Sequence, residues 1–266
     1  MAGSVEISGV HNLANLESAF SNSPTDISQV RLSNFGALSG SGWVDVGLAN
    51  QATGHVRATA NDWMRFGGDG STNAGRITNL GGTIEFGGDL TNQPSGFITG
   101  RGAFIAGNWY NHGSIAVSGT TDIIGHVNNF NGALIVTSGN ATTTFYDTVV
   151  NNGEIRTSGN GNSVFFDEIS GAGNFTGTGS VFFEGNVNPG NSPSVVNFAG
   201  NLSLGSASHT LIELGGLNPG QFDQLKIVGD LSILGSLSVS LWDNFQLGSN
   251  MSFLIADIGG ARFGTF

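Results

Sequence analysis

Apolar residues recur between residues 64 and 196 in short strand-like segments that are spaced about 20 residues apart. Seven segments share this pattern, and they begin at Met64, Ile84, Phe104, Ile123, Thr144, Val164 and Val181. A strand-like unit repeated at such a period is typical of a solenoid, in which each repeat forms one coil and stacks on its neighbours. The pattern therefore predicts an all-β protein, a parallel β-helix (β-solenoid) with about 20 residues per coil.

A second strand is predicted in each coil, after a corner that contains glycine. The corner glycines are Gly75, Gly96, Gly113, Gly132, Gly153 and Gly173, and the apolar residues two places later are Ile77, Ile98, Ile115, Leu134, Ile155 and Phe175. Glycine and asparagine tolerate the left-handed backbone that a sharp corner requires, so we expect the apolar residue to point inward. Asn111, Asn131 and Asn151 recur near these corners, which predicts a ladder of hydrogen-bonded asparagines.

Alternation within the segments predicts which side chains face the solvent, because successive residues of a strand point to opposite sides. The first and third residues of the segments are mostly apolar, so we expect these in the core and the second and fourth residues outside. The last three segments then present an aromatic column and an acidic column: Phe145, Phe165, Phe182, Asp147, Asp167 and Glu184. These six residues form the predicted binding face.

Three explanations of this face remain open. The first is that a loop or the C-terminal segment covers these residues, and the second is that the assignment of inward and outward positions is locally one residue off. The third is that the face binds a glycan or a second copy of the chain. The acidic column is a solvated strip, a Ca²⁺ site or the carboxylate pair of a polysaccharide-degrading enzyme. No other cofactor is expected, and we expect no catalytic residue and no other metal site, since the five histidines follow no metal-ligand spacing.

The two ends of the chain differ from the repeats. Residues 1–40 are predicted to form a leader or an N-terminal cap, with a short amphipathic helix over residues 12–20. Solenoid coils are expected over residues 41–200, and further coils with a β-rich cap over residues 201–266. The absence of a clear polar cap after Gly264 suggests that the sequence is cut from a longer protein. A start with Met-Ala-Gly and no visible signal peptide suggests that a native signal has been removed.

Composition narrows the classes of function. The net charge is −11 with a single lysine, so no basic surface is available for nucleic acid or for an anionic membrane. The chain has no cysteine, which excludes disulfides and thiolate metal sites. No apolar run reaches the roughly 18 residues of a membrane helix, so we expect no membrane insertion by this chain.

The sequence after residue 187 resembles a recurring bacterial module. The matching pieces are NPGNSPS, the stretch from Gly215 to Phe245 with Leu217–Gly220 and Phe222–Leu225, and the strand from Phe253 to Gly260. Together they cover roughly residues 188–260 and resemble the passenger region of autotransporter-type proteins and the exported PEP-CTERM surface proteins. The resemblance implies a right-handed parallel β-helix, secretion, and a structural or adhesive role without shared catalytic residues.

The sequence thus predicts a non-enzymatic structural or adhesive solenoid at the bacterial cell surface or in the extracellular matrix. Its expected partners are other copies of itself, joined end to end by strand addition or laterally, or surface glycans. The alternative is a carbohydrate-binding or polysaccharide-degrading β-helix that uses the aromatic and acidic face.

Overall fold

The computed structural model describes residues 4–16, 30–190 and 193–266. Strands make up 58% of the described residues and form a β-solenoid of about nine turns with about 20 residues per coil. The prediction of an all-β parallel solenoid is therefore confirmed. The chain divides into two compact units, residues 1–136 and 137–266, which are described in turn.

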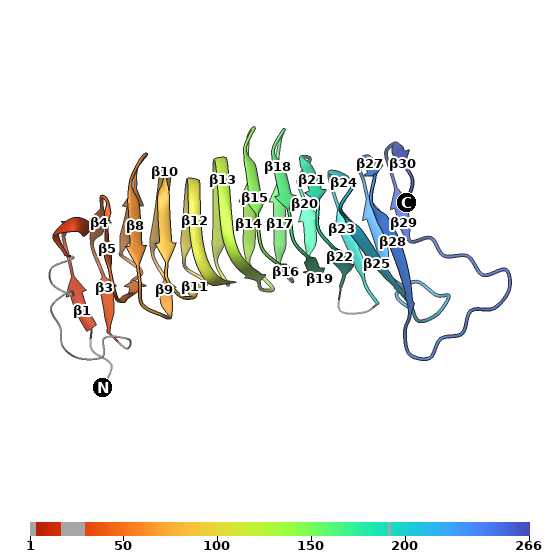
Figure 1. Ribbon diagram of the computed structural model, residues 1–266, viewed down its shortest axis with the longest axis horizontal. Helices are drawn as coiled ribbons and strands as arrows, with labels where there is room; N and C mark the ends of the chain where they lie inside the picture. Colours follow the sequence, from red (N-terminus) through yellow and green to blue (C-terminus); the bar gives the residue numbers. More distant parts are fainter. Residues whose placement is uncertain (1–3, 17–29, 191–192) are drawn as a thin grey trace. The chain divides into compact units, whose positions relative to one another are not determined.

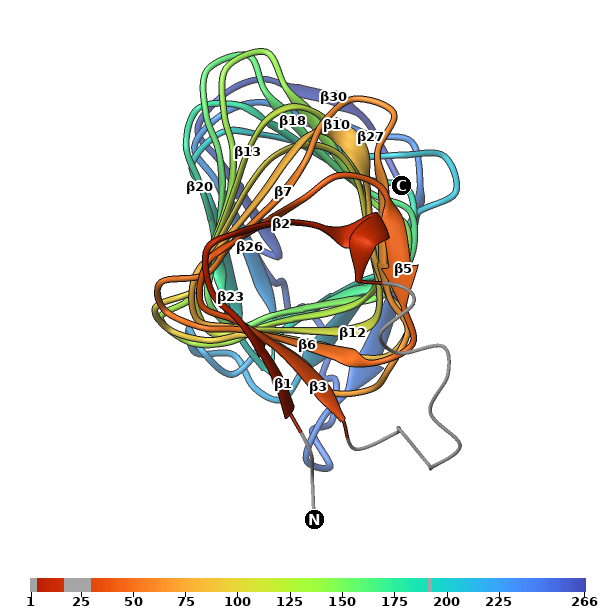
Figure 2. The same ribbon diagram turned by 90° about the vertical axis from the view of Figure 1, so that its left-hand side faces the viewer.

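Each coil of the first unit has three faces, which we name after the first strand of each (Figures 1 and 2). The β1 face contains β1 (Ser4–Ile7), β3 (Arg31–Asn34), β6 (Gly47–Asn50), β9 (Ser71–Asn73) and β11 (Leu90–Asn92). The β2 face contains β2 (Val10–Asn12), β4 (Ala37–Ser39) and β7 (His55–Ala58), and the β5 face contains β5 (Gly42–Val44) and β8 (Trp63–Phe66). The strand pairs within each face are parallel.

Three long strands of the first unit bend around the corners and so belong to more than one face. They are β10 (Arg76–Phe86), β12 (Phe97–Asn111) and β13 (Ser114–Asn129). Met64 pairs with Ile84, and Ile84 pairs with Phe104, and all three side chains are buried. The predicted inward phase of these early segments is therefore correct, because their apolar residues stack on one another from coil to coil.

A ladder of buried asparagines runs along the corner between the β1 face and the β2 face. Its members are Asn34, Asn50, Asn73, Asn92, Asn111 and Asn129. Each amide nitrogen donates to the amide oxygen of the next asparagine at 2.7–2.8 Å. A side chain that both donates and accepts satisfies its own polar groups at every level of the stack. Of the predicted members, Asn111 belongs to this ladder, Asn131 is exposed, and Asn151 is buried in the second unit.

Two corners show why glycine is needed. A Cβ on Gly96 would lie 2.2 Å from Asn92 Oδ1 and 2.3 Å from the Asn73 carbonyl oxygen. Glycine is therefore required there by the close approach of the ladder, whereas Gly132 has the predicted left-handed backbone with φ of 82°. After Gly132 the inward residue is Ile135, so the prediction that Leu134 points into the core is wrong.

The N-terminal segment contains a turn in place of the predicted helix. Residues Leu13–Asn15 form a single 3₁₀ turn (η1), in which the Asn12 side chain accepts a hydrogen bond from the Ala14 backbone N–H at 3.1 Å. Leu13 is fully buried. The rest of the predicted helix, residues 17–20, lies outside the described residues. Strands β1 and β2 already pair with β3 and β4, so coil strands occur within residues 1–40.

The second unit repeats the three-faced coil, and its faces are also named after their first strands (Figure 1). The β15 face contains β15 (Thr142–Phe145), β18 (Asn162–Phe165), β21 (Ser180–Phe183), β24 (Asn201–Leu204), β27 (Leu231–Ile233) and β30 (Arg262–Gly264). The β16 face contains β16 (Val149–Asn151), β19 (Ile169–Gly171), β22 (Val187–Pro189), β25 (His209–Leu214) and β28 (Ser236–Leu241). The β17 face contains β17 (Glu154–Thr157), β20 (Asn174–Thr176), β23 (Val195–Phe198), β26 (Gln224–Ile227) and β29 (Ala256–Ile258). A short strand, β14 (Leu134–Thr137), lies at the boundary of the two units.

Candidate functional site

The predicted outward positions of Phe145 and Phe165 are wrong, because both side chains are buried. Their exposed fractions are 0% and 1%. Phe145 pairs in register with Phe165, and Phe165 pairs with Phe183. The rings of Phe145 and Phe165 stack with centroids 4.6 Å apart. The three phenylalanines thus form one column inside the solenoid and are not available to a ligand.

Buried hydroxyl groups explain the one-residue error in phase. The inward positions at the start of these two segments are Thr143 and Ser163, which are fully buried together with Thr137 and Thr157. Thr137 Oγ1 lies 2.6 Å from Thr143 Oγ1, and Ser163 Oγ lies 2.7 Å from Thr157 Oγ1. Because the hydroxyls satisfy one another, polar residues occupy positions where the apolar pattern predicts none.

Phe182 is the predicted phenylalanine that does lie on the outer surface, where it is half-buried. Its neighbours in register are Val164 on one coil and Ser203 on the next. Thr144 lies beside Val164 on the preceding coil. The outward column at this position is therefore Thr144, Val164 and Phe182, and only one of its members is aromatic.

An exposed aromatic pair that the sequence reasoning missed lies next to the buried column. Tyr146 and Phe166 are 45% and 50% exposed, and their rings stack with centroids 5.6 Å apart. Each follows directly after a buried phenylalanine. The correct phase of the two strands would have identified this pair from the sequence.

The three predicted acidic residues do not form one column. Asp147 and Asp167 come two residues after the buried Phe145 and Phe165, whereas Glu184 comes one residue after Phe183. Since the phenylalanines are in register, Glu184 is displaced from the other two acids. Over residues 4–16, 30–190 and 193–266, no group of three or more His, Cys, Asp or Glu side chains is placed to hold a metal ion.

Two of these acids lie against neighbouring residues of the solenoid. Thr148 Oγ1 donates a hydrogen bond to Asp167 Oδ2 at 3.1 Å. The Glu184 side chain lies over Gly205, where an added Cβ would be 2.2 Å from its Oε2 atom. These contacts hold the acids against the coil surface.

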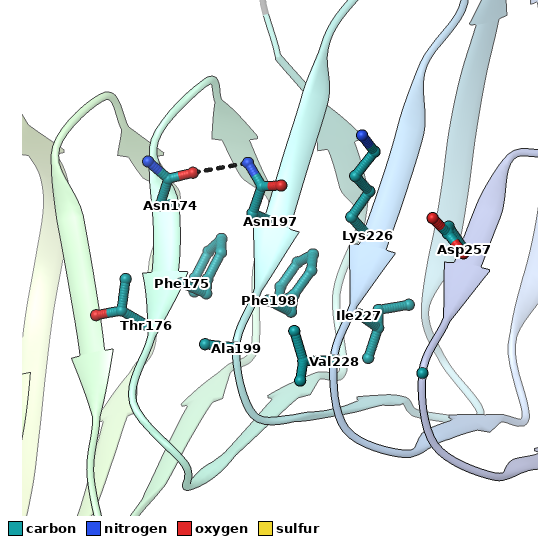
Figure 3. A pocket seen from close by; sticks show the side chains of 11 residues that line it. Asn174, Phe175, Thr176, Asn197, Phe198, Ala199, Lys226, Ile227, Val228 and Asp257 are labelled. Atoms are coloured by element: carbon teal, nitrogen blue, oxygen red, sulfur yellow. Dashed lines mark hydrogen bonds between the residues drawn. The ribbon is translucent and has the colours of Figure 1, made fainter. Parts of the chain in front are cut away.

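A groove of about 460 Å³ crosses the outer side of the β17 face (Figure 3). It is lined by residues of β20, β23, β26 and β29, which come from four successive coils. Phe175 and Phe198 border it but are only 4% and 2% exposed, so their rings, which stack with centroids 4.7 Å apart, belong to the core beneath the groove. We name this groove the β20 groove.

Polar side chains line one side of the β20 groove (Figure 3). Asn197 Nδ2 donates to Asn174 Oδ1 at 3.0 Å. Lys226, the single lysine of the chain, lies in register with Asp257 on the next coil. The four residues form a row with amide, ammonium and carboxylate groups, but the row has no arrangement of a nucleophile with a base.

A second groove of about 310 Å³ lies on the outer side of the β15 face. Its lining comes from β21, β24, β27 and β30 and the adjoining turn: Ser180, Phe182, Asn201, Leu202, Ser203, Asp230, Ser232 and Phe263. We name it the Phe182 groove. Besides Phe182, which is one of the six predicted face residues, its lining includes three serines and a second phenylalanine.

A buried carboxylate fixes the geometry between β25 and β26. Asp223 is 0% exposed and accepts hydrogen bonds from the backbone N–H groups of Ser194 at 2.7 Å and Glu213 at 2.8 Å. Burial raises the pKa of the Asp223 carboxyl, while the two N–H donors favour its charged form. Asp223 therefore ties three segments together and lines neither groove.

The chain matches no known family model, and neither curated protein sequences nor solved structures gave a significant match. No helix within the described ranges has the length and apolar character needed to cross a membrane.

Proposed function

We propose that the chain is a non-enzymatic structural or adhesive β-solenoid, exported to the bacterial cell surface or extracellular matrix, whose copies associate end to end. The observation that carries the proposal is the open apolar core at the coil formed by β28, β29 and β30. Val239 and Leu241 are in register with Ile212 and Leu214, which are buried in the preceding coil. Val239 and Leu241 are themselves 51% and 46% exposed.

A hollow of about 300 Å³ lies in the same end of the stack. Its lining combines side chains of this coil and the preceding one, among them Leu231, Ile233 and Ile258, with residues of the chain segments around Phe253 and Phe266. A further coil stacked on this end would cover these side chains and remove apolar surface from water. The lining is therefore complementary to another coil of the same kind.

The strand edges support the same conclusion. Within the described part of the chain, β28, β29 and β30 pair only with β25, β26 and β27, and β1 and β2 pair only with β3 and β4. An unpaired edge offers backbone N–H and C=O groups to another strand. Because the two edges differ, a contact between them is heterologous, and repeated stacking of one end on the other would produce a filament.

Sedimentation velocity and electron microscopy of the purified chain over a range of concentrations test the proposal. We expect filaments or a concentration-dependent ladder of oligomers. Val239→Lys places a charge on the exposed end and should abolish association. Val228→Lys is the matched control, because Val228 is 70% exposed at the side of the stack.

Two outcomes contradict end-to-end association. One is a monomer at all concentrations. The other is loss of association in Val228→Lys with retention in Val239→Lys, which would indicate lateral contacts.

The proposed location is supported by the resemblance of residues 188–260 to exported surface proteins. The gene sequence on either side of the region that encodes this chain tests the proposed location. An export signal upstream, with a barrel or an anchor segment downstream, is the expected result. A flanking sequence that lacks both would contradict the location while leaving the assembly test unaffected.

A further inference from the structure

We propose that the Phe182 groove binds a neutral, linear polysaccharide along the β15 face. The groove is made by outward side chains that stack in register on four successive coils. Phe182 pairs with Ser203, Ser203 pairs with Ser232, and Ser232 pairs with Phe263. An aromatic residue thus stands at each end of the column, with two small polar residues between them.

The aromatic residues form two walls. Phe263 is 55% exposed and Phe182 is half-buried. Three coil steps of about 4.8 Å place the walls about 14 Å apart. Since serine side chains are short, the space between the walls remains open, and this accounts for the 310 Å³ of the groove. A ligand that enters the groove lies between the two walls.

Polar groups at the rim are held in place by the backbone. Asn201 Oδ1 accepts a hydrogen bond from the Asp230 backbone N–H at 2.9 Å, and Asp230 Oδ1 accepts one from the Ala261 N–H at 2.8 Å. Neither bond uses Asn201 Nδ2 or Asp230 Oδ2. The rim therefore presents one oriented donor and one oriented acceptor, in addition to the hydroxyls of the two serines.

This combination fits a sugar ring. The C–H face of a sugar packs on an aromatic ring, while its hydroxyl groups both donate and accept hydrogen bonds. A peptide strand would instead seek an open strand edge, and the strands here are paired on both sides except at β30. The chemistry of the walls and the rim therefore favours a carbohydrate.

The negative charge of the protein favours a neutral polysaccharide as the ligand. Its net charge is −11, Asp230 lines the groove, and the single lysine lies on another strand, β26. A polysaccharide that carries carboxylates or sulfates would be repelled. An uncharged glycan meets no such repulsion.

Affinity gel electrophoresis and titration calorimetry with defined polymers test this inference. The probes are a neutral soluble β-1,4-glucan, a neutral xylan and a neutral mannan, with polygalacturonate as the acidic comparison. We expect at least one neutral polymer to bind and polygalacturonate not to bind. Phe263→Ala and Phe182→Ala should each weaken binding about tenfold or more. Phe166→Ala is the matched control, because it removes an equally exposed ring outside the groove.

A second variant keeps both walls and fills the space between them. Ser232→Phe should abolish binding while both aromatic walls remain in place. The inference is overturned if no neutral polymer binds, if polygalacturonate binds best, or if Trp63→Ala abolishes binding while Phe263→Ala does not. Trp63 is a 51% exposed aromatic residue of the first unit. Binding retained by Val239→Lys would show that the groove acts independently of end-to-end association.

Discussion

Phe165 stacks on Phe145 inside the second unit, with ring centroids 4.6 Å apart and ring planes within 2° of parallel. The residue that follows each strand, Tyr146 or Phe166, is exposed to the solvent. Two aromatic residues that are adjacent in the sequence thus have opposite roles, and a shift of one residue in the assigned alternation decides which of them is placed in the core.

Phe165→Ala tests this assignment. Removal of a fully buried ring from the column leaves a cavity, and we expect a loss of about 3–5 kcal/mol in the free energy of unfolding. Thermal unfolding followed by circular dichroism should show a melting temperature lower by roughly 10 °C. Phe166→Ala removes the same ring from the exposed neighbour and should change the free energy by less than about 0.5 kcal/mol. Equal effects of the two variants would contradict the assigned phase.

The sequence predicts the solenoid well because its period is carried by many residues at once. Met64, Ile84 and Phe104 are apolar and stack on one another, so a local substitution does not hide the repeat. The predicted binding face depended on the phase of two short segments instead. Thr143 and Ser163 are buried through hydrogen bonds between hydroxyls that lie apart in the sequence, and an apolar pattern cannot reveal them.

The grooves could not be read from the sequence for a different reason. Phe182 and Phe263 come close through three coil steps of unequal length. The spacing from Phe182 to Ser203 is 21 residues, while that from Ser203 to Ser232 is 29. Register across such insertions is set by strand pairing in three dimensions, so a constant period of 20 residues does not align these positions.

The asparagine ladder gives a second prediction. Asn92 donates to Asn111 and accepts from Asn73, each at 2.8 Å, and is 1% exposed. Asn92→Ala leaves a buried donor and a buried acceptor without partners, which should cost about 2–4 kcal/mol. Chemical or thermal unfolding measures the loss. Asn131→Ala is the control, because Asn131 is exposed, and its free energy of unfolding should be close to that of the wild type. A neutral Asn92→Ala variant would contradict a stabilising role of the ladder.

A third prediction concerns calcium. The displacement of Glu184 from Asp147 and Asp167 leaves two acids, rather than three, at one position of the coil. Two carboxylates supply fewer oxygen ligands than Ca²⁺ takes. We therefore expect the same melting temperature in excess CaCl₂ and in excess EDTA. A melting temperature that rises with Ca²⁺ concentration would show that the ion binds the folded chain and would restore the calcium site.

The pH dependence of stability provides a fourth prediction, through Asp223. Burial raises the pKa of its carboxyl above the ordinary value of 3.8. An acid with a raised pKa in the folded state binds its proton more tightly there than in the unfolded chain. Its contribution to stability is therefore fully present below the ordinary pKa and is lost as the pH rises through the folded-state pKa. Glu213, from the neighbouring strand, adds a like charge that acts in the same direction.

Asp223→Asn isolates this contribution, because the other carboxylates titrate in both proteins and cancel in the comparison. The free energy of unfolding, measured at closely spaced acidic pH values, should fall in the wild type relative to Asp223→Asn as the pH rises through the window above 3.8. At higher pH the difference in the free energy of unfolding between the two proteins should become constant. Asp243→Asn changes the net charge equally at an exposed loop position and serves as the control for the change in net charge. A wild type that gains stability over Asp223→Asn in this window would mean that the two backbone N–H donors outweigh the burial of the charge.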